Sequence, residues 1–126
     1  MLAQRKNGHN SAGCGSGNGI GVDLNRNYDA MWVASDAMIG ASNSCQHFTY
    51  KGIAPQSEPE SKAHSDYILN IKPKAYLTIH AFARVVLFPY TYARNAARPH
   101  NYEELMTVSA EIIKRIGPGW KFGQGE

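Results

Sequence analysis

The sequence predicts an α/β fold in which helices lie over a mostly parallel mixed sheet. Two near-continuous apolar runs, residues 75–80 and 84–90, are typical of central strands that are buried on both faces. Two other segments, residues 58–70 and the stretch that starts near Asn101, carry apolar side chains at helical spacing. Strands that alternate with helices along a chain in this way indicate a layered α/β architecture.

The N-terminal part of the chain is predicted to be mostly loop around one short strand. Residues 20–24 are expected to form a buried strand after a glycine-rich segment, residues 8–21, whose glycine spacing does not fit a nucleotide loop. Residues 36–57 are rich in Ser, Gly, Asn and Pro and are expected to form a long loop that is held to the body of the domain. The candidates for holding it are the aromatic residues Trp32, Phe48 and Tyr50.

Local sequence signals place the ends of the first helix. Ser57, followed three residues later by Glu60, forms a capping box, and Pro59 is favourable in a first turn. The helix must end before Pro73, because proline disfavours a helical conformation at the residue that precedes it. Glu58 and Glu60 look like a carboxylate pair, but the helix dipole favours acidic residues in a first turn, and we interpret both as structural.

The second helix is expected to begin near Asn101, with Glu104 at the capping-box position. Its apolar stripe consists of Leu105, Val108, Ile112, Ile113 and Ile116. The Gly-Pro-Gly sequence of residues 117–119 is expected to end it.

The composition is typical of a soluble globular domain. The 126 residues are 43% hydrophobic and 18% charged, with a formal net charge of +3. Lys and Arg are scattered rather than clustered, which argues against nucleic-acid binding. No apolar run approaches the roughly 20 residues that cross a bilayer, and residues 1–10 lack the apolar segment of a signal peptide. If the protein is secreted, its signal is expected to lie outside this chain.

The strongest functional signal is the sequence GVDLNRN at residues 21–27, which places Asn25 beside Arg26 at the end of the expected strand. The planar fork of an arginine pairs bidentately with a carboxylate, and an asparagine adds a neutral donor. These two residues are therefore candidates for a carboxylate clamp. The alternative is that Arg26 pairs with a local acidic residue such as Asp23 or Asp29.

One of the five histidines, His80, lies at the C-terminal end of an expected buried strand. Ligand sites of open α/β sheets form at that edge, and imidazole is the commonest metal-binding side chain. A buried structural histidine is the alternative. The other histidines, which we interpret as solvated bystanders, are His9, His47, His64 and His100.

An ordered set of motifs resembles the zinc metallocarboxypeptidases of the pancreatic carboxypeptidase A/B type. The motifs are Arg5-Lys6-Asn7, GVDLNRN, Ser57-Glu58-Pro59-Glu60 and Thr78-Ile79-His80. The resemblance covers nearly all of the chain but only the central part of such a catalytic domain. It implies that residues 1–126 form a partial zinc carboxypeptidase catalytic domain, with a carboxypeptidase-like three-layer α/β fold truncated at both ends.

The resemblance implies roles for individual residues. His80 matches the third zinc ligand of the family, and Arg5 matches the arginine that polarises the scissile carbonyl and stabilises the oxyanion. An ordinary surface cation is the alternative for Arg5. Asn25 and Arg26 match the pair that grips the C-terminal carboxylate of the substrate. Two residues that match positions lining the substrate cleft are Phe82 and Leu87.

The resemblance also implies features of the backbone and of the cysteines. Non-proline cis peptides are expected at Ala81–Phe82 and Pro89–Tyr90. The spacing of Cys14 and Cys45 leaves a disulfide and two free thiols equally open, whereas the resemblance favours the bridge. A disulfide suits an oxidising compartment, so a secreted or lumenal location (extracellular, or vacuole- or lysosome-like) is expected.

The expected function is zinc-dependent hydrolysis of the C-terminal residue of peptides. A catalytic zinc takes three protein ligands, whereas this sequence offers one candidate and contains no His-x-x-Glu motif, so the isolated chain is expected to be inactive. One alternative is a non-catalytic remnant that binds peptide C-terminal carboxylates. Another is an α/β domain with an unrelated small-molecule site.

Peptide or protein C-termini are the expected partners, without nucleic acid or membrane, and the full-length form is expected to be a monomer. A sheet cut at both ends leaves unpaired strand edges, which favour aggregation. We therefore expect low solubility for the isolated chain.

Overall fold

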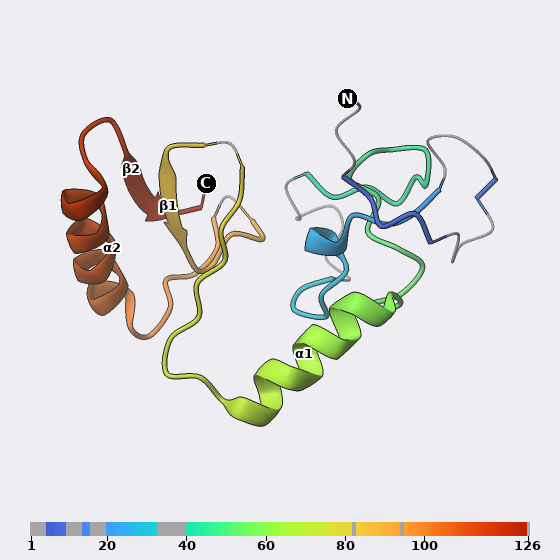
Figure 1. The fold of residues 1–126 in the computed structure, drawn as a ribbon, viewed down its shortest axis with the longest axis horizontal. Helices are drawn as coiled ribbons and strands as arrows, with labels where there is room; N and C mark the ends of the chain where they lie inside the picture. The colour runs from blue at the N-terminus through green and yellow to red at the C-terminus, as the bar shows by residue number, and fades with distance from the viewer. Residues whose placement is uncertain are drawn as a thin grey trace. The chain divides into compact units, whose positions relative to one another are not determined.

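The computed structural model describes residues 5–9, 14–15, 20–32, 40–81, 83–93 and 95–125. The chain comprises two compact units, Met1–Tyr76 and Leu77–Glu126. The first unit contains the 3₁₀ helix η2 (Leu24–Arg26) and helix α1 (Pro59–Ile71). The elements of the second unit are strand β1 (Val85–Phe88), helix α2 (Tyr102–Ile116) and strand β2 (Lys121–Gln124) (Figure 1).

The strand expected at residues 20–24 is not present. Val22 is fully buried, but its carbonyl accepts from the Asn7 N–H at 3.0 Å while the next N–H, of Asp23, donates to the Tyr50 carbonyl at 2.8 Å. The segment therefore makes single backbone bonds to two different segments instead of a ladder with one of them. Asp23 then caps η2, which turns the chain away at Leu24.

Helix α1 confirms the predicted helix, although its N-terminus is capped in another way. The N-cap residue is Glu58, which makes no side-chain capping bond, so the capping box expected between Ser57 and Glu60 is wrong. Instead, the side-chain oxygen of Asn27 accepts the Glu58 N–H at 3.1 Å. A residue distant in the sequence therefore satisfies a donor that a local capping box normally satisfies. The helix ends at Lys72, in a left-handed conformation, before Pro73.

The strand predicted at residues 75–80 is also wrong. These residues form no regular element, and all of them are exposed; Ile79 is 89% exposed. An apolar run becomes a central strand only when neighbouring strands pair with it on both sides. The described residues provide no such partner for this run.

The second unit shows the predicted α/β arrangement in its smallest form. Strands β1 and β2 pair in parallel, with Val86 opposite Phe122, and α2 contacts both strands (Figure 1). The buried side chain of Phe88 packs edge-on against Tyr102 at the start of α2. Strand β1 lies within the predicted run, and α2 ends at Gly117 as expected. The short strand β2 is not predicted from the sequence, because KFGQ carries only one apolar side chain and so lacks a strand pattern.

No helix in the described part of the chain is long and apolar enough to span a membrane.

Candidate functional site

Arg5 is fixed against a buried carboxylate. Its Nε and Nη2 atoms both lie 2.7 Å from Oδ2 of Asp23, a residue that is 3% exposed. The guanidinium also lies 5.5 Å from the centre of the Phe48 ring. The Arg5 side chain remains 42% exposed, and its Nη1 forms no hydrogen bond within the described residues. The arginine is therefore oriented along one edge of its guanidinium while the other edge keeps donors for a ligand.

Asp23 also organises the turn that carries the clamp candidates. Its Oδ1 accepts the Asn25 N–H at 3.2 Å, and its backbone carbonyl accepts the Arg26 N–H at 2.8 Å. One buried residue thus links Arg5 to the pair Asn25 and Arg26. The structure brings these three predicted site residues into one hydrogen-bonded arrangement within the first unit.

Arg26 is half-buried and bonded to carbonyl oxygens. Its Nε donates to the Gly40 carbonyl at 3.1 Å and its Nη1 to the Asn25 carbonyl at 3.2 Å. It forms no ion pair with any residue that the structure describes, because Asp23 pairs with Arg5 instead. The alternative in which Asp23 neutralises Arg26 is therefore wrong.

Asn27 fixes the far end of this turn. It is fully buried, and its side-chain nitrogen lies 2.9 Å from the Lys51 carbonyl. Its side-chain oxygen accepts the Glu58 N–H that begins α1. The other side-chain partners are the Ala54 carbonyl, the Ser57 hydroxyl and the Ser61 hydroxyl. The residue that follows the clamp candidates Asn25 and Arg26 is thus tied to both the loop before α1 and the helix itself.

Glu58 holds the N-terminal segment against α1. Its fully buried carboxylate lies 2.7 Å from Nδ2 of Asn7 and 3.1 Å from Nδ1 of His9, and it accepts from the Ser57 hydroxyl at 2.9 Å. Burial raises the pKa of the nearby Tyr50 phenol, and the negative charge of Glu58 raises it further. Glu58 is therefore structural, as predicted, although through tertiary contacts, and His9 is not a bystander.

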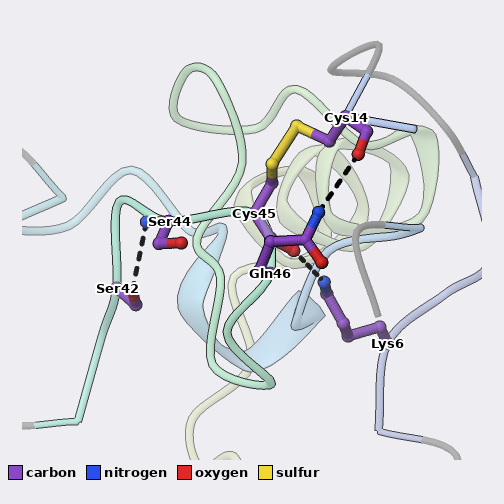
Figure 2. The surroundings of a disulfide bond; sticks show 6 residues. All are labelled: Lys6, Cys14, Ser42, Ser44, Cys45 and Gln46. Carbon is purple, nitrogen blue, oxygen red and sulfur yellow. Dashed lines mark hydrogen bonds between the residues drawn. A yellow bond between two sulfur atoms is a disulfide. The ribbon is translucent and has the colours of Figure 1, made fainter. Parts of the chain in front are cut away.

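The predicted disulfide joins Cys14 to Cys45, with a Cα–Cα distance of 6.1 Å. Figure 2 shows two bonds beside it: Lys6 Nζ donates to the Cys45 carbonyl at 2.7 Å, and Gln46 Nε2 donates to the Cys14 carbonyl at 3.3 Å. Partial burial lowers the pKa of the Lys6 ammonium. The residue after Arg5 is therefore held to the loop that the disulfide closes.

Two other histidines also have partners. His64 lies between two phenols, with Nδ1 2.9 Å from the Tyr28 hydroxyl and Nε2 3.2 Å from the Tyr76 hydroxyl. His47 stacks on Phe48 and contacts Thr49. The interpretation of His64 as a solvated bystander is therefore wrong, whereas His47 and His100 are exposed as expected.

The remaining predicted site residues belong to the second unit. His80 is exposed on the extended segment that replaces the expected strand, and its Nε2 lies 3.2 Å from the Thr78 hydroxyl. Leu87 lies on β1 and is 54% exposed. The Pro89–Tyr90 peptide is cis, as predicted. Phe82, and with it the predicted Ala81–Phe82 cis peptide, lies outside the described residues.

Comparison with known proteins decides the family. The zinc carboxypeptidase family pattern matches residues 2–125. The chain belongs to the zinc carboxypeptidase family. It is 40% identical over 118 residues to bovine (Bos taurus) carboxypeptidase O, a match that covers 92% of this chain and 28% of that protein. It is 42% identical over 111 residues to bovine carboxypeptidase B, covering 83% of this chain and 25% of that protein.

A solved carboxypeptidase-like structure supports the same fold. Bovine thrombin-activatable fibrinolysis inhibitor, in complex with tick carboxypeptidase inhibitor, matches with a TM-score of 0.70 and 35% sequence identity. The match covers 83% of this chain and 36% of that one. This zinc carboxypeptidase chain therefore spans about a quarter to a third of the length of such relatives.

The family implies zinc, so the donor set can be tested against that metal. A catalytic zinc takes three protein ligands, usually His, Glu, Asp or Cys. Among the described residues, no three such side chains are grouped so that they could hold a metal ion. The described part of this chain therefore does not fit a complete zinc site. His80 remains the single zinc-ligand candidate that the sequence indicates.

Sequence reasoning missed the residues that hold the site together. Asp23 is predicted as a possible partner of Arg26, whereas it pairs with Arg5, and no role is predicted for Asn27. Both lie in the GVDLNRN motif, so their proximity to the clamp was the available signal. Their burial depends on contacts with residues 50–61, which no local pattern specifies.

Proposed function

We propose that this chain is the part of a zinc metallocarboxypeptidase catalytic domain that recognises the C-terminus of a peptide. The protein as a whole would hydrolyse the last peptide bond and release one C-terminal residue. Membership of the zinc carboxypeptidase family supports the reaction class. Residues 1–126 form a partial catalytic domain in this proposal, and the isolated chain is inactive.

The observation that carries the proposal is the state of Arg26. Its guanidinium is half-buried and held by two neutral carbonyls, without an ion pair among the described residues. A partly desolvated cation without a counter-ion favours an anionic ligand, and the free carboxylate of a peptide has the geometry that arginine pairs with best. Asn25 is exposed beside it and adds a neutral donor.

Arg5 takes a second role in the same proposal. Asp23 orients its guanidinium, and the donors of the opposite edge then bind the carbonyl oxygen of the bond to be cleaved. In the second unit, His80 is proposed as one zinc ligand, and Phe82 and Leu87 as lining of the substrate cleft.

The disulfide between Cys14 and Cys45 supports a secreted or lumenal location, because such bridges persist in oxidising compartments. We propose a monomer in the full-length form, acting on peptide or protein C-termini.

Titration of the purified chain with short peptides tests the proposal. A peptide with a free C-terminus is expected to bind at least about tenfold more tightly than its C-terminal amide, because the amide cannot form the charged bidentate pair. Arg26→Ala is expected to abolish that difference, while Arg115→Ala on the surface of α2 serves as the matched control. Equal binding of the acid and the amide by the unmodified chain would exclude the clamp.

A further inference from the structure

Phe48 is an aromatic side chain that the chain holds in an exposed position. It was expected to anchor the loop of residues 36–57, yet it is 59% exposed, whereas Tyr50 in the same loop is 5% exposed. An exposed phenylalanine forgoes most of the free energy that its burial supplies. Its position therefore needs another explanation than packing of the loop.

The surroundings of Phe48 keep its ring in place. His47 stacks on it, with ring centres 4.5 Å apart and an angle of 25° between the planes. His47 is itself fixed, because its Nδ1 accepts the Thr49 N–H at 3.2 Å and lies 2.8 Å from the Thr49 hydroxyl. The disulfide at Cys45 and the buried Tyr50 hold the loop on either side. The ring is thus presented by a preorganised loop, which reduces the entropy that a ligand must remove.

The ring also lies beside the arginine of the proposed site. The Arg5 guanidinium is 5.5 Å from the centre of the Phe48 ring, and it also pairs with the carboxylate of Asp23. In the proposed function, Arg5 binds the carbonyl of the bond to be cleaved, and that carbonyl belongs to the penultimate residue of the peptide. Binding of that carbonyl to Arg5 therefore places the penultimate residue, with its side chain, beside the Phe48 ring.

We propose that Phe48 is a specificity-determining residue that packs against an apolar side chain of the penultimate residue of the bound peptide. The inference rests on the proposed function, because Arg5 sets where the peptide carbonyl lies. It adds a preference that the carboxylate clamp does not provide, since Asn25 and Arg26 recognise the terminal carboxylate whatever residue precedes it. Aliphatic and aromatic penultimate residues gain contact area with the ring, and glycine gains none.

The experiment compares two peptides that differ in one residue. Both have a free C-terminus, and the penultimate residue is Leu in one and Gly in the other. Titration of the purified full chain, followed by NMR, is expected to show about three- to tenfold tighter binding of the Leu peptide, with shifts of the Phe48 ring signals. Phe48→Ala is expected to remove the preference and to leave the affinity for the Gly peptide unchanged.

Further variants separate this inference from the proposed function. Arg26→Ala is expected to weaken both peptides by the same factor, because it acts on the terminal carboxylate. Phe48→Leu keeps an apolar side chain and is expected to restore most of the preference for the Leu peptide. The C-terminal amides of both peptides, used at millimolar concentration, report the contact with Phe48 even if the clamp is absent.

The possible outcomes are decisive for Phe48. Loss of the Leu preference in Phe48→Ala, or a Leu-dependent shift of its ring signals with the amides alone, supports the inference. A preference that survives Phe48→Ala, an equal loss for both peptides, or ring signals that none of the four peptides shifts would overturn it. If the unmodified chain prefers the Leu peptide through Phe48 but binds acids and amides equally, the proposed clamp is rejected and the inference about Phe48 stands.

Discussion

Asp23 binds Arg5 along one edge of the guanidinium, with Nε and Nη2 both 2.7 Å from the same carboxylate oxygen. The other carboxylate oxygen accepts the Asn25 N–H and so begins η2. Asp23 is 3% exposed, so both contacts are shielded from water on the carboxylate side. The orientation of Arg5 and the conformation of the turn that carries Asn25 and Arg26 therefore depend on one side chain.

Two substitutions separate the functions of the Asp23 carboxylate. Asp23→Ala removes both contacts. Asp23→Ser keeps a side-chain oxygen that can cap the turn, but the serine carries no negative charge to pair with Arg5. We expect the free energy of unfolding to fall by about 1–3 kcal/mol in Asp23→Ala and by about 1 kcal/mol less in Asp23→Ser. In both variants the Arg5 Nε–H should exchange faster with solvent, as NMR can measure. Unchanged exchange in Asp23→Ser would show that another group orients Arg5.

The elements that sequence predicted correctly are those whose signals are local. The spacing of apolar residues and the terminal Pro73 and Gly117 placed α1 and α2 within about a residue of their observed bounds. The prediction of a strand at residues 75–80 is wrong because an apolar pattern indicates only that a segment needs partner strands. The described residues do not supply such partners. Strand β2 failed in the opposite way, since its pairing with β1 forms it despite a weak pattern.

In the candidate site, too, features with local sequence signals were predictable, and contacts between distant residues were not. The arginines and the adjacent Asn25 were recognisable because residue type and order carry the chemistry of a carboxylate clamp. Which of the two arginines pairs with Asp23 was not recognisable, because on sequence distance alone Asp23 could pair with either Arg5 or Arg26. The burial of Glu58 depends on side chains many residues away, so its helix-terminal position concealed its contacts with Asn7 and His9.

Asn27 is predicted to be the most sensitive polar residue of the first unit. Its amide is fully buried and bonded on both its nitrogen and its oxygen, so Asn27→Ala leaves several buried groups unsatisfied. We expect a loss of about 3–5 kcal/mol in the free energy of unfolding, measured with urea. Asn25→Ala, two residues earlier and exposed, is the matched control and is expected to stay within about 0.5 kcal/mol. Similar losses in the two variants would contradict the conclusion that the buried hydrogen bonds of Asn27 stabilise the first unit.

Tyr50 predicts a loss of stability at alkaline pH. Burial and then the charge of Glu58 raise the pKa of its phenol above the ordinary 10.0. Because the folded state holds this proton more tightly, the stabilising contribution is complete below pH 10.0 and disappears as the pH rises through the folded-state pKa. Urea unfolding at a series of alkaline pH values is expected to show this fall, and Tyr50→Phe should make it shallower. Tyr67→Phe, at an exposed site on α1, is the matched control; the same pH profile for Tyr50→Phe and the unmodified chain would refute the assignment.

The disulfide is predicted to support the segment that carries Arg5. It closes a loop with a sequence separation of 31 residues, for which chain-entropy estimates give about 3–4 kcal/mol of stabilisation. The expected loss in Cys14→Ser/Cys45→Ser is of that size, measured by urea unfolding. Lys6 donates to the Cys45 carbonyl, so the double variant should also broaden or shift the backbone NMR signals of residues 5–7. A change confined to residues near 14 and 45 would mean that the Arg5 segment is held without the bridge.

Two glycines with positive φ distinguish backbone strain from steric conflict. Gly52 has φ +91° and Gly117 has φ +108°, so alanine is strained at both, by about 1–3 kcal/mol. At Gly117 an added Cβ would meet no atom within 4 Å. At Gly52 it would lie 2.6 Å from Nδ2 of Asn27 and 2.7 Å from the Ser57 hydroxyl.

These neighbours of Gly52 have little freedom to move, because Asn27 is bonded on every side and Ser57 donates to the buried carboxylate of Glu58. Gly52→Ala is therefore expected to lose about 1–3 kcal/mol more than Gly117→Ala in urea unfolding. Because displacement of Asn27 distorts the adjacent Arg26, Gly52→Ala should also weaken the proposed peptide binding, whereas Gly117→Ala should leave it intact. Equal losses for the two alanine variants would show that the Asn27 network relaxes around an extra methyl group and does not fix the clamp.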